Sequence, residues 1–123
     1  MSAAAATAAY LMDLPGLTPY DEGLRLMHDL AGARSQQAIP DTMIALEHEP
    51  VVTLGTRTDV AAEIPHPALL EQRGIPVVEV ARGGRATYHG PGQLVGYPIL
   101  DLAPMGRDLR RYVEALEGAM IDA

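Results

Sequence analysis

The stretch "TMIALEHEPVVTLG", residues 42–55, decides the fold that this sequence predicts. Its two halves, "TMIALEH" (42–48) and "PVVTLG" (50–55), are short apolar runs that indicate two successive strands. Pro50 between them indicates a bend or a new strand start, because proline cannot donate to a sheet ladder. Strands this close together leave no room for the regular strand–helix–strand alternation of a parallel sheet.

The sequence after residue 55 predicts two further strands. "TRTDVAAEIPH" is expected to be an irregular connection, followed by a short helix, "PALLEQR", that Gly74 ends. "IPVVEVA", 75–81, is a strongly β-branched strand. "QLVGYPILDL", 93–102, is a nearly continuous apolar strand, expected to be buried on both faces, although Gly96 and Pro98 indicate a bulge or an edge.

Both ends of the chain add helices. A strand ending at Leu14 and a turn, "PGLTP", precede a helix that Thr18 caps and that runs to about Ala33. The segment 106–123 is the clearest helix, with an apolar stripe on one side. The stripe consists of Leu109, Val113, Leu116 and Met120. We therefore predict one α+β domain over residues 1–123, a mixed sheet flanked by helices.

Composition excludes several classes of function. The chain is 48% hydrophobic and 20% charged, with a net charge of −7, which argues against binding nucleic acid. It has no cysteine, and all nine basic residues are arginine, so cysteine and lysine chemistry are absent from it. Without cysteines or an H-x-x-x-H pair we expect no metal site, and we expect no cofactor. No basic residue precedes Arg25, so we expect no secretory signal, no membrane contact and a cytoplasmic location.

The stretch "RGGRATYHGPGQ", 82–93, is the candidate functional segment. Gly83 and Gly84 follow a strand, can adopt positive φ, and leave room for a ligand to approach the backbone. Residues 85–89 are expected to form a short strand with Arg85, Thr87 and His89 on one face and Ala86 and Tyr88 on the other. The spacing matches neither phosphate-binding glycine motif, so a plain turn between strands stays an equal alternative at this point.

The whole string closely resembles the signature of the lipoate-biosynthesis octanoyltransferases, also called lipoyl(octanoyl) transferases. That signature is R-G-G-x-x-T-Y-H-G-P-G-Q followed by an apolar strand, as at residues 82–102. "LEHEPVVTLGTR" (46–57), "GIPVVEVARGG" and "GRDLRRYVEALE" are also similar to the family, so the resemblance covers the chain from about Tyr10.

The resemblance implies the N-terminal part of a biotin/lipoate protein ligase fold, apparently incomplete. It implies transfer of an octanoyl group from acyl carrier protein to a lysine of lipoyl domains, in 2-oxoacid dehydrogenase complexes and glycine cleavage H protein. Family members use a cysteine and a lysine that this chain lacks, and they are about twice as long, so we expect no catalytic residue here. The substrate-binding residues that the resemblance implies are Arg82, Gly83, Gly84, Arg85, Ala86, Thr87, Tyr88 and His89.

Two other readings stay open at this stage. A non-catalytic module that binds an acyl group or its carrier would keep the pocket and the basic residues Arg107, Arg110 and Arg111. A lipoate or biotin ligase relative would need a lysine and a phosphate-binding loop. The last helix carries no stop signal, so we expect an interrupted domain whose final helix lacks its packing partners.

Overall fold

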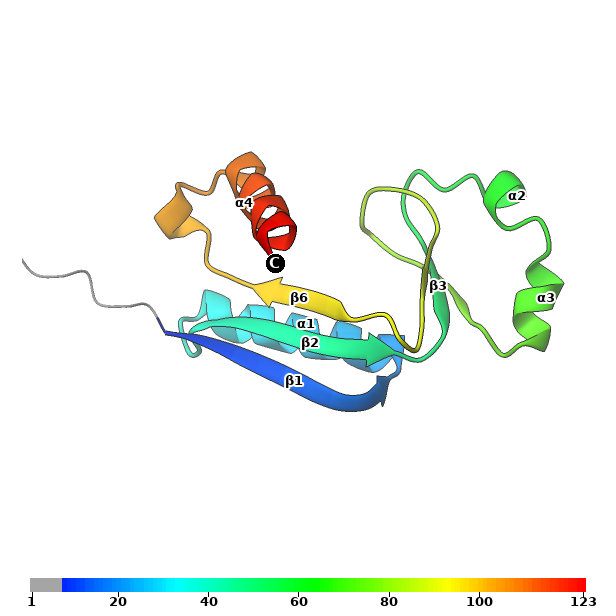
Figure 1. The fold of residues 1–123 in the computed structure, drawn as a ribbon, viewed down its shortest axis with the longest axis horizontal. Helices are drawn as coiled ribbons and strands as arrows, with labels where there is room; N and C mark the ends of the chain where they lie inside the picture. Colours follow the sequence, from blue (N-terminus) through cyan, green and yellow to red (C-terminus); the bar gives the residue numbers. More distant parts are fainter. Residues whose placement is uncertain (1–7) are drawn as a thin grey trace, which may run out of the picture.

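The computed structural model describes residues 8–123, which form two small sheets with helices beside them (Figure 1). Residues 1–7, part of the segment on which the predicted location depends, lie outside the described residues. The first sheet contains, in spatial order, β1 (Ala9–Thr18), β2 (Asp41–His48) and β6 (Val95–Ile99). The second contains β4 (Val77–Glu79), β3 (Val51–Leu54) and β5 (Thr87–His89). The helices are α1 (Tyr20–Ser35), α2 (Val60–Glu63), α3 (Pro67–Gln72) and α4 (Leu109–Asp122), with a 3-10 turn at Ala103–Met105.

β2 is the central strand of the first sheet. It pairs in parallel with β1 and antiparallel with β6. Every second residue of β2 is buried: Thr42, Ile44, Leu46 and His48. α1 packs on this face closely enough that a Cβ at Gly23 would lie 3.0 Å from Cε1 of His48. The strand predicted from "TMIALEH" is therefore confirmed, and α1 explains why one of its faces is buried.

β3 is the central strand of the second sheet, and all four of its residues are buried. It pairs in parallel with β4 and antiparallel with β5, while α2 and α3 lie to the side of this sheet (Figure 1). Each sheet thus has one parallel and one antiparallel pair. The predicted α+β class with mixed strand pairing is confirmed, but the strands form two sheets where the sequence predicted one.

The start of the chain differs from the prediction in its turn and its helix cap. β1 continues through the predicted turn "PGLTP" as far as Thr18, with an irregularity in its pairing with β2 and with Gly16 at φ +72°. Thr18 is therefore the last residue of a strand. Pro19 holds the N-cap position of α1, and no side chain caps that end. The predicted Thr18 cap is wrong because Thr18 pairs with His48 as the last residue of β1.

Three other segments also differ from prediction. The connection after β3 contains α2, which the sequence analysis took as irregular. β4 covers only three residues of the predicted strand 75–81. β6 is shorter than 93–102 and lies at the edge of its sheet, so its residues are not buried on both faces. The edge position that Gly96 and Pro98 indicated is confirmed, because β2 alone pairs with β6 among the described strands.

α4 forms as predicted, and its apolar stripe faces solvent. The side chain of Asp108 accepts a hydrogen bond from the Arg111 N–H at 3.1 Å and caps the helix. Leu109 and Met120, at the two ends of the stripe, are 66% and 71% exposed. Among residues 8–123, no helix combines the length and the apolar character needed to cross a membrane.

Candidate functional site

The glycine-rich segment 82–93 is bound along one side to the chain that leaves β3. The Thr56 N–H donates to the Arg82 carbonyl at 3.0 Å, and the Arg57 N–H donates to the Gly84 carbonyl at 2.9 Å. Gly55 permits this contact, because a Cβ there would overlap the Gly84 carbonyl. Gly84 has φ +91°, a conformation that glycine adopts at little cost. The two glycines therefore shape a fixed backbone rather than a loose loop.

The Arg82 side chain adds further hydrogen bonds between this segment and β3. Its Nη2 donates to Thr53 Oγ1 at 2.6 Å and to the Thr53 carbonyl at 3.3 Å, and its Nη1 donates to the Gly83 carbonyl at 2.9 Å. These bonds to its own chain join the segment to the buried strand β3. The structure thus gives Arg82 a structural role in addition to the substrate contact that the resemblance implies.

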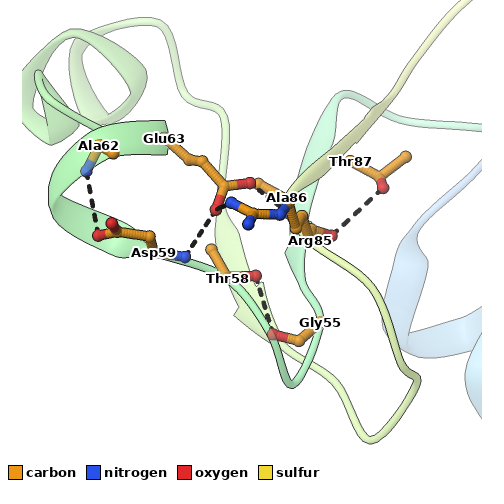
Figure 2. Close-up of polar contacts among 8 residues, drawn as sticks. All are labelled: Gly55, Thr58, Asp59, Ala62, Glu63, Arg85, Ala86 and Thr87. Atoms are coloured by element: carbon orange, nitrogen blue, oxygen red, sulfur yellow. Dashed lines mark hydrogen bonds and ion pairs between the residues drawn. The ribbon is translucent and has the colours of Figure 1, made fainter.

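Glu63 at the end of α2 contacts the middle of the segment (Figure 2). Its carboxylate accepts from the Asp59 N–H at 2.6 Å and from the Ala86 N–H at 3.1 Å, and it pairs with Arg85 Nη1 at 3.4 Å. These donors hold the pKa of the Glu63 carboxyl below its usual value, the Asp59 N–H having the largest effect. Arg85 therefore points toward α2 and does not lie with Thr87 and His89 as predicted.

The remaining residues of the predicted strand alternate as the sequence indicated. Ala86 and Tyr88 line an open groove of about 410 Å³. The other side of the groove comes from α3, the residues before it, and Val52. His89 lies on the opposite face, toward β2, with its ring 5.9 Å from that of His48. Ala86 and Tyr88 thus face the groove, while His89 faces His48.

A tight turn after β5 orients His89. The Gln93 N–H donates to the Gly90 carbonyl at 3.1 Å, with Pro91 second in the turn and Gly92 third at φ +86°, the residues that a type II turn prefers. The turn brings Gln93 Oε1 to 2.6 Å from His89 Nδ1, while Gln93 Nε2 donates to the Tyr88 carbonyl. An amide oxygen only accepts, so Nδ1 of His89 carries the proton, and in the neutral ring Nε2 is the acceptor.

A group of aromatic rings around buried His48 lies beside His89. His48 is fully buried, its Nδ1 donates to the Thr18 carbonyl at 3.0 Å, and its Nε2 accepts from the Tyr97 hydroxyl at 2.5 Å. The ring of Tyr20, at the start of α1, lies 5.3 Å from that of His48. The group therefore joins α1, β2, β6 and β5 at one point.

Burial keeps the two bonded side chains of this group uncharged. It lowers the pKa of His48, the Thr18 carbonyl opposes this shift, and a charge on His89 would lower it further. Burial also raises the pKa of Tyr97 to about 12, with a smaller contribution from Tyr20. His48 is therefore a neutral ring with both nitrogens bonded, so its role is to hold the rings in place.

Comparison with known proteins identifies the family. Residues 19–123 match the lipoyl protein ligase A/B catalytic domain. The chain belongs to this family. The octanoyltransferase of Sphingopyxis alaskensis is 49% identical over 109 residues, covering 89% of this chain and 47% of that one. That of Solibacter usitatus is 45% identical over 107 residues, covering 87% and 49%. The chain therefore spans about half the length of the curated relatives it matches.

Two solved structures also align with the chain. A bipartite lipoate protein ligase from Thermoplasma acidophilum aligns with a TM-score of 0.48 and 25% identity, covering 75% of this chain and 34% of that one. P. falciparum LipL1 in complex with lipoate aligns with a TM-score of 0.49 and 14% identity, covering 72% and 29%.

Several residues of the candidate site escaped the sequence analysis. The sequence analysis gave His48 no role; within residues 8–123, no three acidic or histidine side chains are grouped to hold a metal ion. The alternation of β2 could have placed His48 on the buried face, because Ile44 and Leu46 have the same parity. No local signal indicated the roles of Tyr20 and Tyr97 or the contacts of Glu63 with Arg85 and Ala86, because these partners lie far away in the sequence.

Proposed function

We propose that this chain forms the acyl-binding region of an octanoyltransferase, which moves an octanoyl group from acyl carrier protein to a lysine of a lipoyl domain. The observation that carries the proposal is the rigidly bound segment 82–93 in a member of this family. Relatives named octanoyltransferase support acyl transfer as the type of reaction. The proposed acceptors are the lipoyl domains of 2-oxoacid dehydrogenase complexes and the glycine cleavage H protein.

We place the thioester end of the substrate beside Gly83, Gly84 and His89. An added Cβ at Gly83 would meet no heavy atom within 4 Å, so a ligand can reach this backbone. Nε2 of His89 is free of hydrogen bonds to the described residues, while Gln93 holds Nδ1. The other candidates of the segment are proposed to shape and fix the backbone: Arg82, Arg85, Ala86, Thr87 and Tyr88. This division of roles is part of the proposal.

The carrier protein is proposed to dock at the start of α4. Arg107, Arg110 and Arg111 are exposed there, in a chain whose net charge is otherwise strongly negative. Arg110 pairs with Glu114 at 3.5 Å, but both side chains are largely exposed, so the pair is weak and can be exchanged for a partner carboxylate. An acidic carrier surface fits this group of arginines by charge.

The 123-residue chain should bind the acyl group without transferring it. The family resemblance assigns the acyl intermediate to a cysteine assisted by a lysine, and this sequence contains neither. A threonine or histidine without an arranged partner does not replace that pair. Transfer of octanoyl from its carrier to a lipoyl domain by this chain alone would refute that part of the proposal.

Binding of two soluble thioesters tests the proposed site. S-octanoyl-N-acetylcysteamine should shift the amide resonances of Gly83, Gly84 and Thr87 in a saturable way. S-butanoyl-N-acetylcysteamine is four CH₂ groups shorter, and at about 0.8 kcal/mol per buried CH₂ it should bind more than about a hundredfold more weakly. Equal binding of the two thioesters, or no saturable shift with the octanoyl compound, would reject an acyl site in this segment.

A further inference from the structure

Glu63 connects two segments that lie far apart in the sequence. One carboxylate oxygen, Oε2, accepts from the Asp59 N–H at 2.6 Å and closes the first turn of α2. The other, Oε1, accepts from the Ala86 N–H at 3.1 Å, across 23 positions of sequence. The side chain is only 21% exposed, so it lies between the two segments (Figure 2). Oε2 also accepts from Arg85 Nη1 at 3.4 Å, so both oxygens bind the glycine-rich segment and one of them also binds the start of α2.

This pattern requires a carboxylate of this length. A glutamine in the same place has one accepting oxygen, and its NH₂ group would face one of the two N–H donors. An aspartate is shorter by one CH₂ and would not span both distances. Asp59 in turn accepts from the Ala62 N–H at 3.3 Å, so α2 is fixed to its own start while Glu63 reaches outward. α2 is thus a short helix fixed by its own hydrogen bonds, and its Glu63 side chain contacts the glycine-rich segment.

The hydrogen bond from the Ala86 N–H to Glu63 lies between two backbone positions that other interactions fix. On one side, the Gly84 carbonyl is bound by the Arg57 N–H at 2.9 Å. On the other, Thr87 begins β5. Among the described residues, Glu63 is the only side chain outside 82–93 that hydrogen-bonds Arg85 or Ala86. Removing the Glu63 side chain would therefore release residues 85 and 86, which lie between Gly83–Gly84 and His89.

We propose that Glu63 is a positioning residue, which holds residues 85 and 86 so that Gly83–Gly84 and Thr87–His89 form one preformed surface for an acyl thioester. The proposal depends on the proposed function for the identity of the ligand. The hydrogen bonds by which Glu63 holds the backbone do not depend on the proposed function. The lowered pKa of Glu63 agrees with a carboxylate that stays charged at neutral pH.

Amide hydrogen exchange of the 123-residue chain tests the hold on the backbone directly. In Glu63→Ala both the Asp59 and Ala86 amides should exchange about tenfold faster, the effect of losing one hydrogen bond of ordinary strength. In Glu63→Gln only one of the two should do so. Glu71→Ala is the matched control and should change neither, because the Glu71 side chain, in neighbouring α3, makes no hydrogen bond to the described residues. The buried amides of β2 and β3 report whether each variant is folded.

Binding of S-octanoyl-N-acetylcysteamine then tests the link to function. The dissociation constant should rise at least about fivefold in Glu63→Ala and stay unchanged in Glu71→Ala. Unchanged Ala86 exchange in folded Glu63→Ala would overturn the proposal, and so would faster exchange with unchanged binding. If the unsubstituted chain binds no thioester while Ala86 exchange still rises in Glu63→Ala, the hold by Glu63 stands and the proposed function fails.

Discussion

His48 is a polar side chain at a position where the alternation of β2 calls for an apolar one. It lies in the same buried row as Ile44 and Leu46, and its exposed fraction is zero. A buried imidazole is tolerated when both nitrogens find partners, and here a backbone carbonyl and the Tyr97 hydroxyl supply them. Tyr97 therefore stabilises the buried His48 ring, although it lies in an edge strand.

Replacing Tyr97 by phenylalanine should destabilise the fold through His48. The hydroxyl is lost, the buried Nε2 keeps no partner, and an unsatisfied buried acceptor costs about 1–3 kcal/mol. Urea unfolding measures this loss. Tyr112→Phe is the matched control, because the Tyr112 hydroxyl bonds no described residue, and it should cost under about 0.5 kcal/mol. Equal losses in the two variants would mean that the hydrogen bond to His48 contributes nothing.

At the scale of elements, one polar group ties α1 to the first sheet. Arg34 in the last turn of α1 pairs with Asp41 at 2.8 Å and with Asp101 at 3.7 Å. Asp41 begins β2, and it also accepts from the Asp101 N–H at 2.9 Å, just after β6. The Asp101 N–H and the Arg34 guanidinium hold the pKa of Asp41 below its usual value. Three elements thus meet at one carboxylate.

The replacement Asp41→Asn at the start of β2 should therefore cost more than the same change at Asp21 on α1. It removes a half-buried ion pair while an acceptor remains for the Asp101 N–H, so we expect a loss of about 1–2 kcal/mol in the free energy of unfolding. Asp21→Asn breaks another Asp–Arg pair, with Arg25, whose side chains are exposed. That control should cost under about 0.5 kcal/mol. If denaturant unfolding gave similar losses of stability for both variants, the Asp41 carboxylate would not be what holds these elements together.

The sequence predicted which elements exist better than where they end. Periodicity located α1 and α4, and Pro67 and Gly74 bounded α3, because these signals act within a few residues. The ends of β1, β4 and β6 were wrong because a strand ends where its partner ends, and the partners are distant in sequence. The same limit applies to the site. The segment 82–93 was found as a string, whereas Glu63 and Tyr97 join it only through the fold.

In the whole molecule, the core and the candidate site share one junction. The buried apolar core residues all lie on β2 and β3: Ile44, Leu46, Val51, Val52 and Leu54. Only Glu49 and Pro50 separate the two strands, and the Glu49 N–H donates to the Thr18 carbonyl at 3.1 Å. The chain therefore passes from one sheet to the other at Pro50, and the strands form two sheets instead of one. His48 lies immediately before this passage, where α1, both sheets and His89 meet.

This position makes His48 a source of acid sensitivity for the whole fold. Burial lowers its pKa in the folded state, while in the unfolded chain the value is about 6.5. As the pH falls below about 6.5, His48 binds a proton in the unfolded state but not in the folded state. The free energy of unfolding therefore falls until the pH reaches the lowered pKa of the folded state. One pH unit below 6.5 removes up to about 1.4 kcal/mol. Asp41 and Glu63 have lowered carboxyl pKa values and lose their contributions only at more acid pH.

Urea unfolding at pH 7.5 and pH 5.5 measures this effect. The unsubstituted chain should be less stable at pH 5.5, and His48→Gln should be less stable at both values but with a smaller difference between them. His28→Gln, which replaces an exposed histidine of α1, is the control and should keep the full difference. The same difference in His48→Gln as in the unsubstituted chain would show that another group carries the pH dependence. The junction of the two sheets would then not be the point at which acid opens the fold.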